Sequence, residues 1–360
     1  MSTPGLFFAA NMCIQISLSR GLLLALALVL ATGCQPVAEN HLLDYLKALE
    51  AITGTHTAVT RTSGLVTYPS HRQRHLPLPA LRLGFGEFFD LYGCRLFTLI
   101  NERNSIMGRV MPVSQRLVYE IRFLQAAVEC RDRLQRDGQS TVIQRLDGIL
   151  QSKRRMLPRL FWNATFDSPE MARAFSLAVS PLAPHEEAGF AASSAALDYF
   201  LALGERLEDA DFQVDSGVLE SHYQTLQAHH YGGRLATTLA LLADYLDAAS
   251  HTLAQIGTDC PDRPASNAPW RALALALAPV NALVETVEQQ GQAWLLRVNR
   301  LIDLPGTQPP TAFQQYRARM LGLKGGLWQR FQRVLQHHRA VQQRWLRACA
   351  PPELADQLRF

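Results

Sequence analysis

The sequence predicts an all-α protein made of a helical hairpin and a long antiparallel helix bundle. Apolar residues recur at alternating spacings of three and four over three stretches, 235–256, 270–301 and 327–348, and this is the period of an α-helix. Almost no stretch shows the strict alternation typical of strands. Apolar residues make up 48% of the 360 residues and charged residues 18%, so the chain has the composition of a globular protein with a substantial core.

The first predicted helix covers residues 40–53 and ends at Gly54, because its leucines share one helical face. Residues 55–83 follow as an extended connector, since three prolines prevent one long helix. The basic residues of this connector are His71, Arg72, Arg74 and His75. A solvated loop is the favoured interpretation, and contact with anionic lipid headgroups is the alternative.

Residues 85–136 are predicted to form a helical hairpin that turns near Pro112. The apolar faces of its two helices are Phe88, Leu91, Leu96, Leu99 and Ile100, and then Leu117, Ile121, Leu124 and Val128. In an antiparallel pair, residues equidistant from the turn lie at the same height, and Pro112 is the midpoint of Cys94 and Cys130. A disulfide between Cys94 and Cys130 is therefore expected.

Residues 139–159 are polar and basic, and they are followed by two shorter predicted helices. The first starts at Ser168, which can cap it with Pro169 and Glu170 in the first turn, and reaches about Ser180. The second runs from about residue 188 to residue 208.

The three regular stretches are predicted to pack as an antiparallel bundle, with the first helix broken at Gly232 and Gly233 and the second bent at Pro279. The second of these helices leaves the loop that holds Cys260, and the third, of similar length, returns Cys349 to the same end. Apart from Cys13 and Cys34, the chain has four cysteines, and four cysteines allow three disulfide connectivities. Because any pairing of Cys349 with the hairpin would bring unrelated segments together, the second expected disulfide is Cys260 with Cys349.

The stretch RGLLLALALVLATGC, residues 20–34, resembles the signal peptide of a bacterial lipoprotein. Its apolar run of about ten residues is too short to span a membrane. The small residues before Cys34 resemble a lipobox, so Cys34 is the expected lipidation site, carrying diacylglycerol with acyl chains such as palmitate. An ordinary secreted protein cut near Ala31 is the alternative. Since residues 1–19 carry no Lys or Arg, Met12 is expected to be the true initiator.

Gln35 follows Cys34, which by resemblance to lipoprotein sorting favours the outer membrane, with the protein facing the periplasm. That compartment is oxidising and suits the two disulfides. The expected organisation is a signal peptide over 1–33, an N-terminal helical part over 34–215 that includes the hairpin 85–136, and a C-terminal bundle over 216–360, packed as one unit. The formal net charge of +4 is too small to predict nucleic-acid binding.

Residues 101–124, NERNSIMGRVMPVSQRLVYEIRFL, carry the most distinctive pattern of the chain. With Cys94 before this block, Cys130 after it and the lipobox upstream, the chain resembles the domain-of-unknown-function 3080 family, lipoproteins of Gram-negative bacteria. The resemblance covers the mature chain and is specific in this block. It implies a location and a shared architecture, and it implies no activity.

The sequence predicts no catalytic residue, no cofactor and no metal site. Two histidine pairs, 229–230 and 337–338, consist of neighbours that point about 100° apart on a helix, so neither pair chelates by itself. His338 holds a core position of its helix and is expected to be a buried, hydrogen-bonded histidine. None of the common catalytic or nucleotide-binding motifs occurs.

The candidate polar site lies at the turn of the hairpin, where carboxylate, guanidinium and amide groups concentrate. Its members are Asn101, Glu102, Arg103, Asn104, Arg109, Arg116, Tyr119 and Glu120. The functional interpretation is a polar pocket or a docking surface. The structural interpretation has Asn104 or Ser105 capping helix ends and Glu102 and Glu120 pairing with arginines, and it is favoured about two to one.

The leading hypothesis is a non-enzymatic outer-membrane lipoprotein that binds another envelope component, either a protein or the cell-wall polymer. The first alternative is a carrier or sensor for a small apolar or anionic ligand, which requires a sizeable cavity. The second alternative is a hydrolase with Glu102 or Glu120 as general base, which requires that acid to lie open in a cleft.

Overall fold

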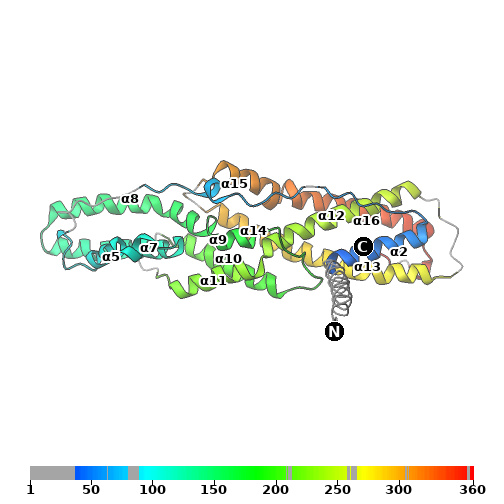
Figure 1. Cartoon of the computed structure of the whole chain (residues 1–360), viewed down its shortest axis with the longest axis horizontal. Helices are drawn as coiled ribbons and strands as arrows, with labels where there is room; N and C mark the ends of the chain where they lie inside the picture. The colour runs from blue at the N-terminus through cyan, green and yellow to red at the C-terminus, as the bar shows by residue number, and fades with distance from the viewer. Residues whose placement is uncertain are drawn as a thin grey trace, which may run out of the picture.

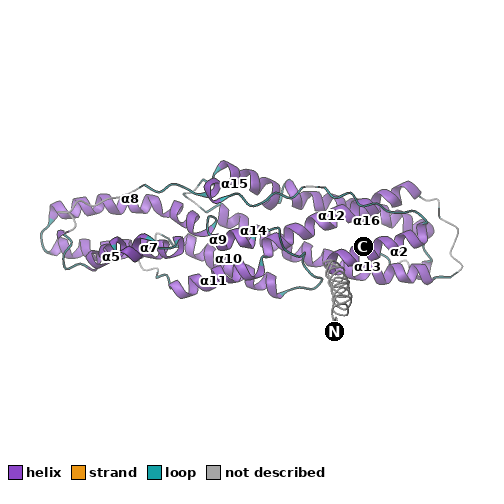
Figure 2. Ribbon diagram, viewed as in Figure 1, coloured by secondary structure: helices purple, strands orange, loops and turns teal. Residues whose placement is uncertain are grey.

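The computed structural model describes residues 37–62, 64–79, 89–207, 209, 213–257, 260, 266–304, 306, 308–354 and 357–360. Within these ranges the chain is helical and contains no strand, as the sequence predicts (Figure 2). The helices build an elongated rod (Figure 1). The predicted leader, with Met12 and Cys34, lies outside the described residues.

The rod has three parts along its length (Figure 1). One end is the hairpin region, formed by α5 (Arg95–Asn104), α6 (Ile106–Arg109), α7 (Val113–Arg136) and α8 (Ser140–Thr165). The middle holds α9 (Pro169–Ala174), α10 (Ala188–Glu205), α11 (Ser216–His229), α14 (Gln292–Ile302) and α15 (Thr311–Tyr316). The other end is the bundle of α2 (Val37–Thr53), α12 (Tyr231–Ile256), α13 (Ala268–Thr286) and α16 (Gly326–Cys349).

The hairpin forms as predicted, but its first helix begins later than its apolar pattern suggests. Leu91 is buried in a turn before α5, and Phe88 lies outside the described residues. The helix starts only at Arg95, because Gly93 has a φ of +86° and Cys94 is extended. The predicted disulfide between Cys94 and Cys130 is confirmed, with the two Cα atoms 5.4 Å apart.

The long helix α8 was not predicted, because its sequence is polar over most of its length. The helix spans 26 residues and packs along α7. Its buried side chains in the first half are Leu146 and Leu150, which complete a small core under the hairpin. Exposed polar residues surround Leu146 and Leu150 in the sequence, so the narrow apolar stripe is difficult to recognise.

The helix α9 starts at Ser168 as predicted, and the Ser168 Oγ accepts a hydrogen bond from the Met171 N–H at 3.1 Å. It ends at Ala174 and does not reach Ser180, so the predicted length is wrong. The chain after it lies directly against α12. A Cβ on Gly233 would stand 1.8 Å from the main-chain oxygen of Ser176, so glycine is required at this contact.

A helix break was predicted at Gly232 and Gly233, but the structure places the break two to three residues earlier, at His230. The helix α11 ends at His229, and His230 adopts a left-handed conformation with a φ of +47°. Both glycines belong to the first turn of α12. Their function is therefore to allow the close approach of Phe175 and Ser176, and the change of direction is made by His230.

The bundle confirms the second disulfide, Cys260 to Cys349, with Cα atoms 5.3 Å apart. The helix α12 packs on α16, and α2 packs on α13 and α12. Pro279 lies inside α13, and a π-helical turn, η1 (Val287–Gly291), connects α13 to α14. This continuous stretch, 268–302, is long and apolar enough to cross a membrane, but its Trp270, Leu273 and Leu277 are buried in the bundle as core residues.

His338 lies in the centre of the bundle, as the sequence predicts, with 0% of its surface exposed. Its Nε2 lies 2.9 Å from the Tyr45 hydroxyl and its Nδ1 lies 2.9 Å from the Ser250 Oγ. The Ser250 hydroxyl donates to the Leu246 oxygen at 2.6 Å. A neutral imidazole that donates from Nδ1 to Ser250 and accepts from Tyr45 at Nε2 satisfies all three groups. Burial, assisted by the nearby charges of His337 and Arg339, lowers the pKa of His338 to about 3.

This buried histidine predicts a specific acid sensitivity. In the unfolded chain a histidine titrates near 6.5, so between pH 6.5 and pH 3 the unfolded state binds more protons than the folded state. Stability is therefore complete above pH 6.5 and falls as the pH decreases, by about 1.4 kcal/mol per pH unit from this group. Urea unfolding from pH 4 to pH 7.5 should show a weaker pH dependence for His338→Gln than for the natural protein. Equal slopes for the two proteins would contradict this assignment.

Candidate functional site

The polar residues predicted at the hairpin turn do not converge on one site. Asn101, Glu102 and Asn104 are exposed on α5. Arg103 is half-buried, and its guanidinium donates to the main-chain oxygen of Gly108. The Ser105 Oγ accepts from the Gly108 N–H at 3.1 Å, so the predicted cap is made by Ser105. These contacts fix the turn.

Tyr119 and Glu120 are both buried on α7, whereas Glu102 is exposed on α5. The Glu120 Oε2 lies 2.5 Å from the Lys153 Nζ of α8, and these two side chains are only 5% and 11% exposed. The expected partner was an arginine, so that part of the prediction is wrong. Burial and the negative charge of Glu120 raise the pKa of Tyr119. Glu120 is thus a paired structural residue, and it does not lie open in a cleft.

The remaining members of the predicted site lie on either side of the turn. Arg109 is exposed on α6, and Arg116 is half-buried with a buried Nε that has no hydrogen-bond partner. Among the described residues no ion pair joins Glu102 to an arginine, which differs from the expected pairing. The helix α7 is joined to α11 nearby, because Ser114 and Gln115 both donate to Glu220, at 2.7 and 2.8 Å.

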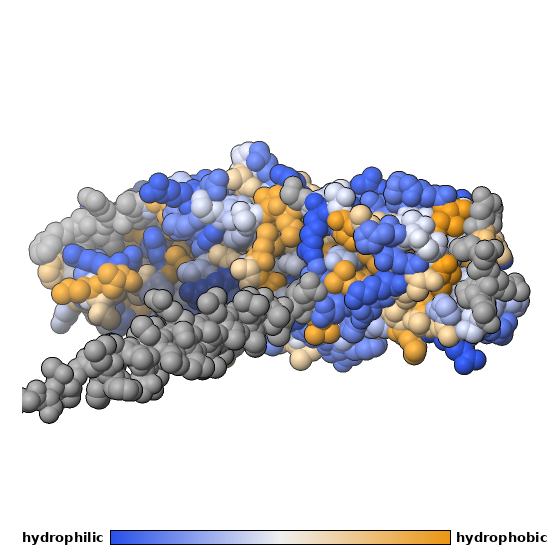
Figure 3. All heavy atoms as spheres, turned by 45° about the vertical axis from the view of Figure 1, so that its right-hand side comes forward, coloured by the Kyte–Doolittle hydropathy of each residue, from blue (hydrophilic) through white to orange (hydrophobic). Residues whose placement is uncertain are grey.

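The turn between the hairpin helices exposes apolar side chains that are not part of the predicted polar site. Ile106, Met107 and Val110 are 84%, 77% and 72% exposed, and we call these three residues the apolar turn. Figure 3 shows that, on one face of the rod, apolar patches are separated by polar residues. The apolar turn is the described segment where three large exposed apolar side chains fall within five consecutive residues.

Two hollows in the described part of the chain bear on the predicted ligand-binding alternative. An apolar cavity between α8 and α14, lined by residues such as Phe161 and Leu301, holds only about 20 Å³. That volume accommodates about one water molecule. An open groove of about 890 Å³ lies between α7 and α8 and is lined by Arg131, Arg154 and Arg155. Arg131 is already paired with Asp147 at 2.7 Å.

The connector, which was expected to be solvated, instead docks on the middle of the rod through a single helical turn, α3 (His71–Arg74). Four hydrogen bonds to residues 162–166 fix it to the end of α8. The Trp162 Nε1 donates to the Arg74 oxygen at 2.8 Å, and Asn163 both donates to and accepts from the main chain of Leu76, at 2.8 and 2.9 Å. The Tyr68 hydroxyl donates to the Phe166 oxygen at 2.8 Å.

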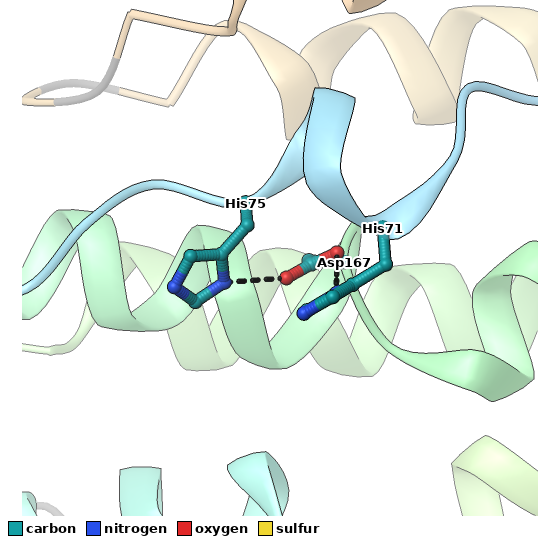
Figure 4. Close-up of side chains that lie close together, drawn as sticks. All are labelled: His71, His75 and Asp167. Carbon is teal, nitrogen blue, oxygen red and sulfur yellow. Dashed lines mark hydrogen bonds and ion pairs between the residues drawn. The ribbon is translucent and has the colours of Figure 1, made fainter.

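This docking brings two histidines of the connector to one buried carboxylate (Figure 4). The Nδ1 atoms of His71 and His75 lie 2.7 and 2.8 Å from the two oxygens of Asp167. Asp167 is 1% exposed, whereas the side chains of His71 and His75 are 66% and 40% exposed. The Arg74 Nε lies 3.3 Å from Asp167 Oδ1. The ligand atoms of the three residues all lie within 4.8 Å of one another.

The sequence indicates that the two histidines lie together, but it does not indicate that Asp167 joins them. His71 and His75 are four residues apart and share a helical face, and Ser70 and Gln73 mark a helix start, with the Ser70 N–H donating to Gln73 Oε1 at 3.0 Å. Nothing in the sequence connects them to Asp167, which is 92 residues after His75. The cluster depends on the docking of the connector, and this contact is tertiary.

By its fold, the described part of the chain is an all-α, disulfide-bonded rod, with one disulfide in its hairpin and one in its bundle. A family model described as protein of unknown function (DUF3080) matches residues 42–351. The chain therefore belongs to the DUF3080 family. Neither the curated proteins nor the solved structures gave a match.

Proposed function

We propose that this protein is a non-enzymatic binding protein of the cell envelope, anchored by a lipid on Cys34 to the outer membrane and facing the periplasm. The lipobox-like stretch before Cys34 supports the anchor. The two disulfides support an oxidising compartment, because such bonds persist there and are rare in the cytosol.

The apolar turn is the observation that supports a binding role. Large apolar side chains in a soluble protein are usually exposed singly, and contiguous ones mark interaction sites. Here three of them lie on one turn at 72–84% exposure, while Leu275 and Leu296 are exposed singly elsewhere. The turn itself is restrained, since Arg103 and Ser105 both hydrogen-bond to the main chain of Gly108. A rigid apolar surface loses little conformational entropy when it binds.

The chemistry of the turn favours a protein partner over the cell-wall polymer. Ile106, Met107 and Val110 offer hydrocarbon and a thioether, and a glycan strand presents mainly hydroxyl groups. Arg109 lies in the same turn and is exposed. The matching surface is therefore an apolar recess with an acidic side chain at its edge.

Site-specific photocrosslinking in intact cells tests this proposal. A photoreactive amino acid at Met107 should give one discrete crosslinked product, and the product should disappear when Ile106 and Val110 are both changed to serine. Leu275, which is 78% exposed but isolated, is the matched control position. Equal crosslinking from Met107 and Leu275 would refute the apolar turn as the docking surface.

The anchor is tested in the same cells. Intact-mass measurement of the natural protein from the membrane fraction should show a lipid-sized addition at Cys34, and Cys34→Ala should lack that addition and keep the leader uncut. An unmodified Cys34 would overturn the anchor without affecting the docking result.

A further inference from the structure

We propose that His71, His75 and Asp167 bind a divalent transition-metal ion, with Zn²⁺ as the probe, and that the ion clamps the connector to the end of α8.

The ligand set is the first support. Two imidazole nitrogens and one carboxylate are donors that suit zinc and its neighbours in the first transition series. His71 and His75 are four residues apart, and the Asp167 carboxylate lies between their imidazoles, each of which faces a different carboxylate oxygen (Figure 4). With three protein ligands, the remaining coordination position is open to water, because both histidines are partly exposed.

The site is held in place by its surroundings. Asp167 is 1% exposed and lies between the end of α8 and the start of α9. The main chain of the connector is fixed on both sides of the histidines, by Tyr68 and by the paired bonds of Asn163 with Leu76. An ion would therefore bind to groups that are already ordered, and little chain entropy would be lost.

A purely structural ion pair does not require both histidines. Asp167 already has a buried guanidinium beside it, since Arg74 is 7% exposed with its Nε 3.3 Å from Oδ1. One arginine balances one carboxylate. The two additional imidazoles are 66% and 40% exposed, and hydrogen bonds and ion pairs open to solvent contribute little to stability. Their convergence on the same carboxylate is what a metal site requires.

Arg74 also limits the affinity of the site. Its two terminal nitrogens donate to the main-chain oxygens of Pro69 and Asp167, and its Nε has no well-aligned hydrogen bond. The positive charge is therefore fixed near the carboxylate and repels a cation. Affinity in the micromolar range is expected, below that of structural zinc sites.

Only small movements are needed for the ion to enter. The present distances of 2.7 and 2.8 Å between Nδ1 and the carboxylate oxygens are hydrogen-bond distances. Ligand atoms about 2.0–2.1 Å from a tetrahedral ion are about 3.4 Å apart. Each Nδ1 must then move about 0.6 Å away from its carboxylate oxygen, ligand atoms that are now up to 4.8 Å apart must approach to about 3.4 Å, and each imidazole must carry its proton on Nε2. Both side chains have solvent on one side, so this movement is not obstructed.

Titration calorimetry with ZnCl₂ tests the proposal on the untagged, oxidised full chain after treatment with EDTA. One ion per chain should bind, and His71→Ala and His75→Ala should each weaken binding at least tenfold. His56→Ala is the matched control, because His56 belongs to the same connector and is 82% exposed beside Glu50. That variant should bind like the natural protein.

A second measurement reports the geometry of the site. Co²⁺ in place of Zn²⁺ should give the intense visible absorption of four-coordinate cobalt, and the double variant His71→Ala/His75→Ala should abolish it. Because both histidines are exposed, these variants should keep the natural circular dichroism. The absence of saturable binding at one ion per chain, or equal binding by the double variant, would overturn the proposal.

Discussion

Replacing Lys153 with methionine is expected to lower the free energy of unfolding by about 3–5 kcal/mol. The substitution leaves the Glu120 carboxylate without its partner in a site where the acid is only 5% exposed. An uncompensated buried charge is among the most destabilising changes in a protein. The Lys153 ammonium also lies 4.2 Å from the centre of the Phe123 ring, and that attraction is lost as well. Urea unfolding of the oxidised protein measures the effect.

The double variant Glu120→Gln/Lys153→Met distinguishes the cost of leaving a buried carboxylate unpaired from the net contribution of the ion pair to stability. It should recover most of the loss, because a neutral pair of similar volume needs no charge compensation. Lys47→Met is the control, since Lys47 and Asp44 form an exposed pair, with 72% and 60% exposure, and its removal should change stability by less than about 0.5 kcal/mol. A loss below about 1 kcal/mol for Lys153→Met would contradict the role assigned to this buried pair.

Removing the bundle disulfide with Cys260→Ser/Cys349→Ser is expected to lower the free energy of unfolding by about 4 kcal/mol. The bond closes a loop with a sequence separation of 89 residues, and cross-linking such a loop reduces the entropy of the unfolded chain. The thermal midpoint and the urea midpoint should both fall. Both cysteines are changed together so that no free thiol remains.

The hairpin disulfide provides the comparison. Its separation is 36 residues, and because the entropic effect grows only with the logarithm of loop length, Cys94→Ser/Cys130→Ser should cost less by about 1 kcal/mol. Unchanged stability in both double variants, or four reactive thiols in the natural protein, would contradict the contribution assigned to these bonds.

Much of the fold follows from the sequence because its elements are regular. The stripes that begin at Leu235, Trp270 and Leu327 correspond to α12, to the α13–α14 stretch and to α16. The positions of the cysteines follow from antiparallel geometry, and both pairs are confirmed. Local signals also located α9 at Ser168, although its end was placed too late because the contact with α12 is tertiary.

The candidate site was much less predictable. Proximity in sequence suggested that the polar residues near Pro112 act together, but the turn directs Glu102 to solvent and Glu120 to the interior beside Lys153. The sequence presents Lys153 only as part of a basic cluster in a polar segment. In the same way, Asp167 is one acid in a loop, and its histidine partners are more than 90 residues away. Periodicity carries no information on such contacts.

The position of α2 has a consequence for the order in which the chain folds. This first described helix packs on α13 and α12, and its Tyr45 contacts a residue 293 positions later in the chain, His338. The hairpin helices α7 and α8 are sequence neighbours and can pair as soon as both exist. In contrast, the apolar face of α2 has no native partner until most of the polypeptide is available. The bundle is therefore a late, high-contact-order structure, and α2 is the segment exposed longest to aggregation before it closes.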